Sequence, residues 1–132
     1  MTRLGLDTSV VVRLLVGVPE DQARKAKERV EQALEAGHTL LVTDLAIAET
    51  YHALHYHYGM PKPETRALLE RFVASGIVRL DPESSLPALA HATGAGLVDR
   101  LIHVRHRALA AITLTFDRRH AQLEGSERLE AD

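Results

Sequence analysis

The apolar positions of this chain fall into short runs, separated by longer segments in which apolar residues recur at helical spacing. Short apolar runs predict buried strands, and segments with a period near 3.6 predict amphipathic helices. The predicted strands are residues 4–6, 39–42, 77–80 and 111–115, with 128–129 as a final edge strand. The main predicted helices are residues 20–36, 44–58, 63–73, 82–93 and 97–107, and shorter ones follow the first and fourth strands.

Turn and capping residues support these boundaries. Gly37 predicts the end of the helix over 20–36, because glycine readily adopts the left-handed conformation at a helix C-terminus. Thr43 or Asp44 is placed to cap the next helix with its side chain. Asp81, followed by Pro82, predicts a further helix start, with aspartate as the cap and proline as the first residue.

Strands that alternate with helices imply right-handed crossovers and a parallel sheet covered on both faces. We therefore expect an α/β protein, a three-layer α/β/α sandwich with a central parallel sheet of four to five strands. A length of 132 residues predicts a single domain over residues 1–132. The chain has no repeat, low-complexity tract or linker composition.

Composition narrows the function classes. The absence of cysteine excludes disulfide scaffolds, thiolate zinc sites and cysteine nucleophiles. The formal net charge of −2 shows no overall basic excess, so any contact with RNA needs a local arrangement of basic groups. The N-terminus lacks the layout of a signal peptide, and no apolar run has the length needed to cross a bilayer. We expect a soluble, cytoplasmic protein with no membrane partner.

Four acidic residues stand in apolar surroundings that a solvated surface does not explain. Asp7 and Asp117 directly follow predicted strands, while Glu49 and Asp99 lie within apolar helical segments. Ligands bind at the carboxyl ends of the strands in open parallel sheets. Several carboxylates brought together repel one another unless a cation lies between them, and hard oxygen ligands suit Mg²⁺ or Mn²⁺. The hypothesis is metal-assisted hydrolysis of a phosphodiester bond.

At these residues the sequence resembles a known family. The segment Leu6-Asp7-Thr8-Ser9-Val10-Val11 is similar to the opening motif of PIN domains, and Glu49 resembles their second acid. Asp99, ahead of a helix, and Asp117, in Thr115-Phe116-Asp117, resemble the third and fourth. The order and approximate spacing match across nearly the whole chain, and the length resembles the VapC-like toxins of toxin–antitoxin pairs.

The resemblance implies a PIN-like α/β/α fold and an endoribonuclease that uses Mg²⁺ or Mn²⁺, forms a homodimer and binds a small VapB-like antitoxin. It implies that Asp7 is the central metal ligand, that Asp99 shares the metal, and that Asp117 completes the site or holds a second ion. Glu49 would bind or orient the metal-bound water. Hydrogen bonds from Thr8, Ser9 and Thr115 would steady these catalytic carboxylates.

The chain departs from the family pattern in the basic residues that follow Asp99 and Asp117. Asp99 lies on a different helix face from Leu97, Leu101, Val104 and Ala108, which are expected to pack on the sheet. The hypothesis is that a basic cluster holds the RNA backbone near the metal. Its members are Arg100, His103, Arg107, Arg118 and Arg119, with His106 beside them. A solvated basic face is an equal alternative.

Other interpretations stay open. Asp7 and Asp117 also fit plain helix capping, and Glu49 and Asp99 a solvated helix face. The whole chain could be a catalytically silent PIN-like module that binds RNA or protein. Assignment as a phosphoreceiver or as a phosphatase of the haloacid type is disfavoured, because each of these classes requires a second acid near Asp7 that the sequence lacks. The stripe Ile47, Tyr51, Leu54 and Tyr58 predicts core packing or an interface, and the histidines form no zinc motif.

Overall fold

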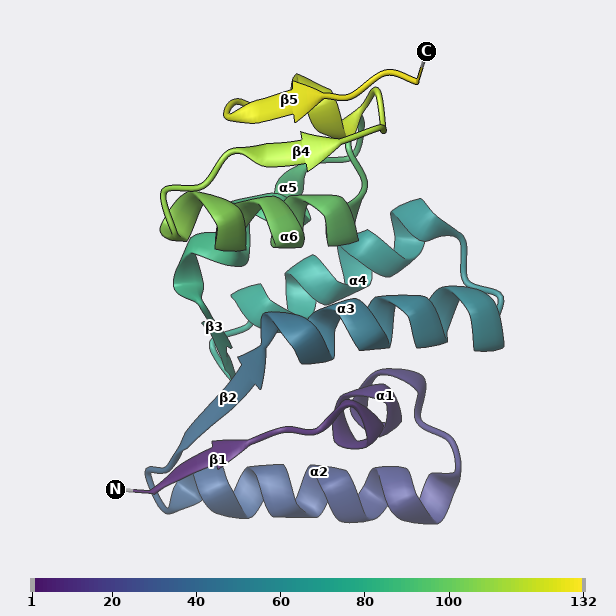
Figure 1. Cartoon of the computed structure of the whole chain (residues 1–132). Helices are drawn as coiled ribbons and strands as arrows, with labels where there is room; N and C mark the ends of the chain where they lie inside the picture. Colours follow the sequence, from purple (N-terminus) through teal and green to yellow (C-terminus); the bar gives the residue numbers. More distant parts are fainter. Residues whose placement is uncertain (1, 132) are drawn as a thin grey trace.

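A computed structural model describes residues 2–131. The part of the chain up to residue 81 builds a parallel sheet from β1 (Arg3–Gly5), β2 (Thr39–Thr43) and β3 (Arg79–Asp81), with β2 in the centre (Figure 1). Leu4 pairs with Leu40, and Val42 pairs with Leu80. The α/β class predicted from the alternating pattern is therefore confirmed: parallel strands are joined by helices.

Except for α5 (Leu86–Ala90), the helices that follow these strands begin and end close to where the sequence predicts. They are α1 (Thr8–Val16), α2 (Glu20–Glu35), α3 (Asp44–His52), α4 (Lys62–Ala74), α5 (Leu86–Ala90) and α6 (Leu97–Ala108). A π-helical turn, η1 (Ala53–His57), prolongs α3, so the helix predicted to reach residue 58 is present. Thr43 caps α3 by accepting a hydrogen bond from the backbone N–H of Ala46.

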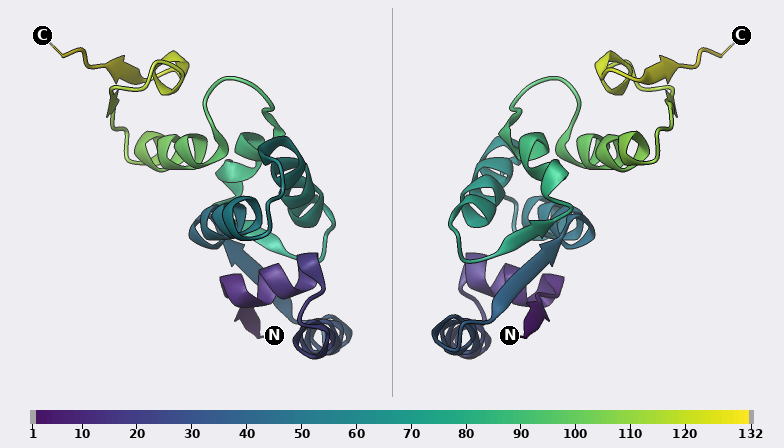
Figure 2. Two further views of the ribbon diagram at one scale, coloured as in Figure 1. Left: turned by 90° about the vertical axis from the view of Figure 1, so that its right-hand side faces the viewer. Right: turned by 90° about the vertical axis from the view of Figure 1, so that its left-hand side faces the viewer.

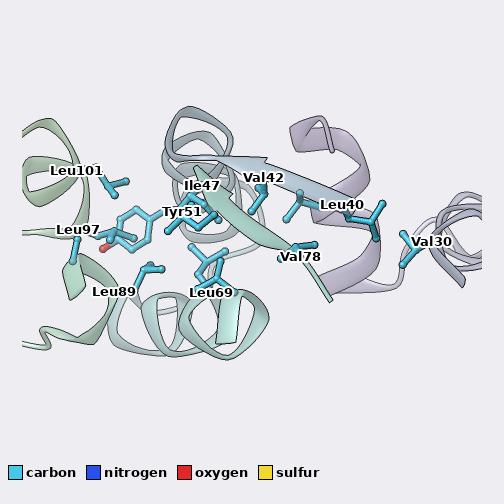
Figure 3. Close-up of a cluster of buried hydrophobic side chains, with 14 of the residues drawn as sticks. Val30, Leu40, Val42, Ile47, Tyr51, Leu69, Val78, Leu89, Leu97 and Leu101 are labelled. Carbon is cyan, nitrogen blue, oxygen red and sulfur yellow. The ribbon is translucent and has the colours of Figure 1, made fainter. Parts of the chain in front are cut away.

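The core runs from the first sheet through α3 and α4 to α5 and α6. Figure 3 shows its side chains in one continuous row. Ile47, Leu54, Leu69 and Leu89 are completely buried, and Tyr51 is nearly so. The stripe on α3 is therefore core for its first three members, whereas Tyr58 is exposed. Burial of this apolar surface is the main term that stabilises the fold.

The helix predicted over residues 82–93 is wrong in its details. Asp81 is the last residue of β3, and the chain continues as a 3₁₀ turn, η2 (Glu83–Ser85), before the short α5. The side chain of Asp81 does not cap the turn, which follows Pro82 without a side-chain cap. A second proline, Pro87, explains the difference: it has no N–H to donate to residue 83, so an α-helix has to begin just before it.

The last two strands form a separate sheet, in place of extending the first one as the sequence analysis expected. β4 (Thr113–Thr115) pairs in parallel with β5 (Ser126–Arg128), and the 3₁₀ turn η3 (His120–Gln122) lies between them. Residues 109–131, called here the C-terminal arm, project from the rest of the chain beyond α6 (Figure 2). The expected single sheet of four to five strands is thus replaced by a three-stranded and a two-stranded sheet.

Helix α6 lies between the core and the arm. Its predicted apolar stripe is half confirmed, because Leu97 and Leu101 are buried whereas Ala108 is exposed. A bidentate ion pair ties the helix to the start of α3: Arg105 donates from Nε and Nη2 to the two carboxylate oxygens of Asp44, at 2.7 and 2.8 Å. Among residues 2–131, no helix combines the length and apolar character needed to cross a lipid bilayer.

Candidate active site

The carboxylate of Asp7 lies at the end of β1 and caps helix α1. Its Oδ2 accepts hydrogen bonds from the hydroxyl of Ser9 at 3.0 Å and from the backbone N–H of Ser9 at 3.4 Å. The hydroxyl, followed by the backbone N–H, lowers the pKa of Asp7 below its usual value of 3.8. Asp7 is therefore an exposed, ionised carboxylate at neutral pH.

Glu49 is held next to Asp7 by the neighbouring threonine. The hydroxyl of Thr8 donates a hydrogen bond to Oε1 of Glu49, and this bond joins the first turn of α1 to the middle of α3. Glu49 is exposed, on the solvent side of a helix whose other side carries the buried Ile47 and Tyr51. Asp7 and Glu49 thus form one pair of exposed acids at the carboxyl end of the first sheet.

Asp117 follows β4, as Asp7 follows β1. Its Oδ1 accepts a hydrogen bond from the backbone N–H of His120 at 2.8 Å, and this is the main reason that the pKa of Asp117 lies below 3.8. Its own backbone N–H donates to the hydroxyl of Thr115 at 3.0 Å. Asp99, in the first turn of α6, lies with its Oδ1 3.7 Å from Nδ1 of the buried His120.

Asp99 and Asp117 line the same cavity, with a volume of about 410 Å³. The end of α3, the start of α4, the loop before α6, the first turn of α6 and the arm form the rest of the wall, which carries several basic side chains. These are His52, Lys62, Arg66, His91 and Arg119. The cavity therefore combines two carboxylates with cationic groups that can hold a phosphate.

The four acids predicted from the sequence come together as two pairs and not as one cluster. Within residues 2–131, no group of three or more histidine and acidic side chains is placed to hold a metal ion. Asp7 and Glu49 lie by the three-stranded sheet, and Asp99 and Asp117 lie by the arm. The oxygen donors have the chemistry that Mg²⁺ or Mn²⁺ prefers, but the donor set of one copy in this conformation does not surround an ion.

Comparison with known protein families decides the identity of this fold. The sequence matches the family described as PIN domain over residues 5–126, a range that includes all four acids. The chain belongs to the PIN domain family. Comparisons with curated proteins and with solved structures found no match. PIN domains are typically nucleases and generally use divalent metal ions, so membership suggests an activity of the nuclease type.

The residues predicted to steady the acids of this PIN domain make the contacts described above. Thr8 donates to Glu49, and Ser9 donates to Asp7. Thr115 contacts the backbone of Asp117 and not its carboxylate. Asp7 also caps α1, so the capping role and a chemical role coexist in one side chain.

The basic cluster predicted after Asp99 divides into several environments. Arg100 donates from Nε to the carbonyl oxygen of Ala95 at 2.9 Å and from Nη2 to that of Thr93 at 3.0 Å, so it braces the loop before α6. Arg107 lies against Gly125. Arg118 and Arg119 are exposed, and Arg119 reaches the cavity beside Asp117.

His103, predicted to contact RNA, lies in a buried position between α6 and the arm. His103 is only 8% exposed, with Nδ1 3.0 Å from the hydroxyl of Thr113 and Nε2 2.7 Å from the carbonyl oxygen of Glu124. His106 places its Nδ1 2.7 Å from the same hydroxyl. These histidines join α6 to β4 through Thr113 and to β5 through Ser126, whose hydroxyl lies 3.4 Å from Nδ1 of His103. The helix face that the sequence left for solvent is thus covered by β4 and β5.

Sequence reasoning missed the basic wall of the cavity. Lys62 and Arg66 belong to α4, and their charges look like those of any solvated helix face. His91 stands in the loop after α5. No spacing rule connects these residues with Asp99 or Asp117, since the connection exists only in the folded chain.

Proposed function

We propose that this PIN domain is an endoribonuclease that hydrolyses RNA phosphodiester bonds and depends on Mg²⁺ or Mn²⁺. The observation that carries the proposal is the placement of Asp7 and Asp117 at equivalent strand ends, each with a second acid nearby. All four acids lie within the range that matches the family. Asp7 and Asp117 are exposed, ionised at neutral pH and fixed by hydrogen bonds, as cation ligands should be.

The surroundings of the second pair support RNA as the substrate. The cavity beside Asp99 and Asp117 carries the exposed Arg119, and a guanidinium can hold a phosphate with two parallel hydrogen bonds. Arg66 in the same wall adds positive charge, although its Nη1 already donates to the carbonyl oxygen of Leu89 at 2.6 Å. The net charge of the chain is −2, so electrostatic attraction to RNA depends on this local group of cations and not on an overall positive charge of the protein.

We further propose that the nuclease is the cytoplasmic toxin of a type II toxin–antitoxin pair, neutralised by a small VapB-like protein. The order and spacing of its acids, which resemble those of VapC-like toxins, support this assignment. Expression of the wild-type chain should then arrest bacterial growth, and Asp7→Asn should not. Growth at the normal rate in the presence of measurable ribonuclease activity would be consistent with the proposed ribonuclease and would reject the proposed toxin.

The central experiment is an RNA cleavage assay with Mg²⁺ or Mn²⁺. Asp7→Asn is the informative variant, because asparagine caps a helix about as well as aspartate but removes the negative charge. Glu28→Gln, on the exposed side of α2, is the matched control with the same loss of charge. We expect cleavage by the wild type and the control, a loss of 100-fold or more in Asp7→Asn, and no cleavage with a chelator. Cleavage that survives either Asp7→Asn or metal removal would refute the proposal.

The separation of the two acid pairs favours a second candidate, a PIN-like module that binds RNA or protein without catalysis. Such a module would hold single-stranded RNA through the basic cavity wall and leave it intact. Filter binding with the same RNA distinguishes the two: binding that weakens in Arg66→Ala and Arg119→Ala, with no cleavage under any metal, would select the silent module.

A further inference from the structure

Four strand edges lack a partner among residues 2–131, two in each sheet, and β1 and β4 provide two of them. Within residues 2–131, β1 pairs only with β2, and β4 pairs only with β5. An unpaired edge presents free N–H and C=O groups and pairs readily with another strand. The two edges lie at opposite ends of the molecule, since β1 and the arm are separated by α3 and α6 in every view (Figures 1 and 2).

In β4 and the residues next to it, the apolar side chains face solvent and a polar side chain faces the protein, which is the reverse of the usual pattern in a surface strand. Ile112, Leu114 and Phe116 are 66%, 61% and 68% exposed, whereas Thr113 between them is buried against α6. One whole face of the arm is therefore apolar and open to solvent, which marks an interaction surface.

An apolar groove of about 500 Å³ runs beside β1. Its floor includes Leu4, Leu6, Val10 and Leu40. The rim carries Arg13, Lys25 and Arg29, and among the described residues none of these three forms an ion pair with a carboxylate. The arm carries exposed carboxylates at Glu124 and Glu127 and exposed arginines at Arg118, Arg119 and Arg128, so its charge is mixed. The complementarity between the groove and the arm is therefore one of apolar surface and not of net charge.

The strands also match in register. Asp7 lies two residues after β1 ends, and Asp117 lies two residues after β4 ends. Parallel pairing of Arg3–Gly5 with Thr113–Thr115 sets Leu4 beside Leu114. It brings the carboxylates of Asp7 and Asp117 to neighbouring strand ends, about 4.8 Å apart in the pairing direction.

We propose that the C-terminal arm of one copy pairs with β1 of a second copy, in a reciprocal exchange that completes two sites per dimer. Each site combines Asp7 and Glu49 of one copy with Asp117 of the other. Asp99 accompanies Asp117, because both are linked to His120. The exchange deepens the proposed function: it rests on that function for its activity readout, and it explains why one copy holds the acids only as pairs.

A second copy, and not the same chain, is the partner because the arm is fixed where it is. The turn between α6 and β4 is only residues 109–112, and the backbone N–H groups of Leu109, Ala110 and Ala111 bond back to the last turn of the helix. His103 ties α6 to the arm, and Arg105 ties α6 to α3. Movement of the arm onto its own β1 would break these contacts and uncover part of the core. A closed two-fold dimer breaks none of them.

Cysteine cross-linking tests the exchange without using activity, since the natural chain has no cysteine. Leu4→Cys and Leu114→Cys, purified separately, are mixed, allowed to exchange and oxidised. We expect a disulfide-linked species of twice the 14.6-kDa chain mass. Ile77→Cys, exposed and just before β3 at the other edge of the sheet, replaces Leu4→Cys as the control and should give none with Leu114→Cys.

The double variant with both cysteines in one chain distinguishes pairing between two copies from pairing within one chain. A species of two chains joined by two disulfides supports the reciprocal exchange. A disulfide within a single monomeric chain, or a ladder of longer linked chains, overturns it. No cross-link in either experiment also overturns it. Neither result depends on whether the protein cleaves RNA.

Complementation then joins the exchange to the activity. Asp7→Asn and Asp117→Asn, each inactive alone, are co-expressed with different tags. Half of the randomly paired dimers are mixed, and one of the two sites in each mixed dimer has both natural acids, so about a quarter of the wild-type activity should return. Cross-linking with no activity in any protein would retain the exchange and reject the nuclease. Active wild type with no complementation would reject the shared site.

Discussion

Replacement of Arg105 by alanine removes the cation that neutralises a buried carboxylate. Asp44 is only 5% exposed, and both of its oxygens accept from the guanidinium, which itself is 52% exposed. After the replacement, the carboxylate keeps a hydrogen bond from the backbone N–H of Leu45, at 2.9 Å, and the weaker effect of its own backbone N–H. The variant leaves a buried charge short of partners, which is the costly way to break an ion pair.

The expected loss of stability depends on the difference between the buried carboxylate and the half-exposed guanidinium. Loss of one partner of a fully buried pair lowers the free energy of unfolding by about 3–5 kcal/mol. Because the guanidinium is half solvated, we expect Arg105→Ala to lower it by about 2 kcal/mol. Asp44→Ala leaves an arginine that water can solvate, so we expect about 1 kcal/mol. The double variant should lose about 2 kcal/mol, which gives a coupling of about 1 kcal/mol.

Urea unfolding followed by circular dichroism, at one protein concentration for all variants, measures these differences. Unfolding at acidic pH tests the direction in which the ion pair changes the stability. The ion pair lowers the pKa of Asp44 below 3.8, so its stabilising contribution is present above about pH 4 and lost as the pH falls through the lowered pKa. The gap between wild type and Asp44→Ala should therefore narrow from pH 7 to pH 2.5. An unchanged gap, or additive single variants, would refute this account of the pair.

Three further outcomes are expected. Leu69→Ala, at a fully buried position, should lower the free energy of unfolding by about 2–5 kcal/mol, whereas Leu45→Ala, at 77% exposure, should change it by less than about 0.5 kcal/mol in the same urea assay. Ser9→Ala should raise the pKa of Asp7 toward 3.8 in an NMR titration, because the largest cause of its lowering is the Ser9 hydroxyl, and an unmoved pKa would contradict that cause. His103→Ala should cost about 1–3 kcal/mol and speed amide exchange in β4 and β5 more than in β2; equal protection in both sheets would mean that the histidine does not hold the arm.

Local features of this fold could be predicted from the sequence because they depend on neighbours along the chain. The helix predicted over residues 97–107 is observed as Leu97–Ala108, and the cap at Thr43 is present. The acids at the ends of β1 and β4 were also found, since each follows an apolar run directly. In each case the pattern lies within one element.

Features that depend on contacts between distant elements could not be predicted. The separation of β4 and β5 from the first sheet depends on which strand edges meet, and the apolar patterns of the strands are the same in either arrangement. The burial of His103 depends on the arm that covers it. The pairing of Asp44 with Arg105 joins residues 61 positions apart, and nothing in either local sequence indicates it.

The contacts of His103 and His106 couple the protons of two hydroxyl groups between α6 and the arm. The carbonyl oxygen of Glu124 can only accept, so Nε2 of His103 donates to it; in the neutral ring, Nδ1 is then an acceptor within reach of the hydroxyls of Thr113 at 3.0 Å and Ser126 at 3.4 Å. If Thr113 donates to His103, its single hydrogen is used and His106 has to donate to it from Nδ1; if Ser126 donates to His103, Thr113 can donate to His106. The tautomer of His106 therefore depends on which hydroxyl donates to the neighbouring histidine.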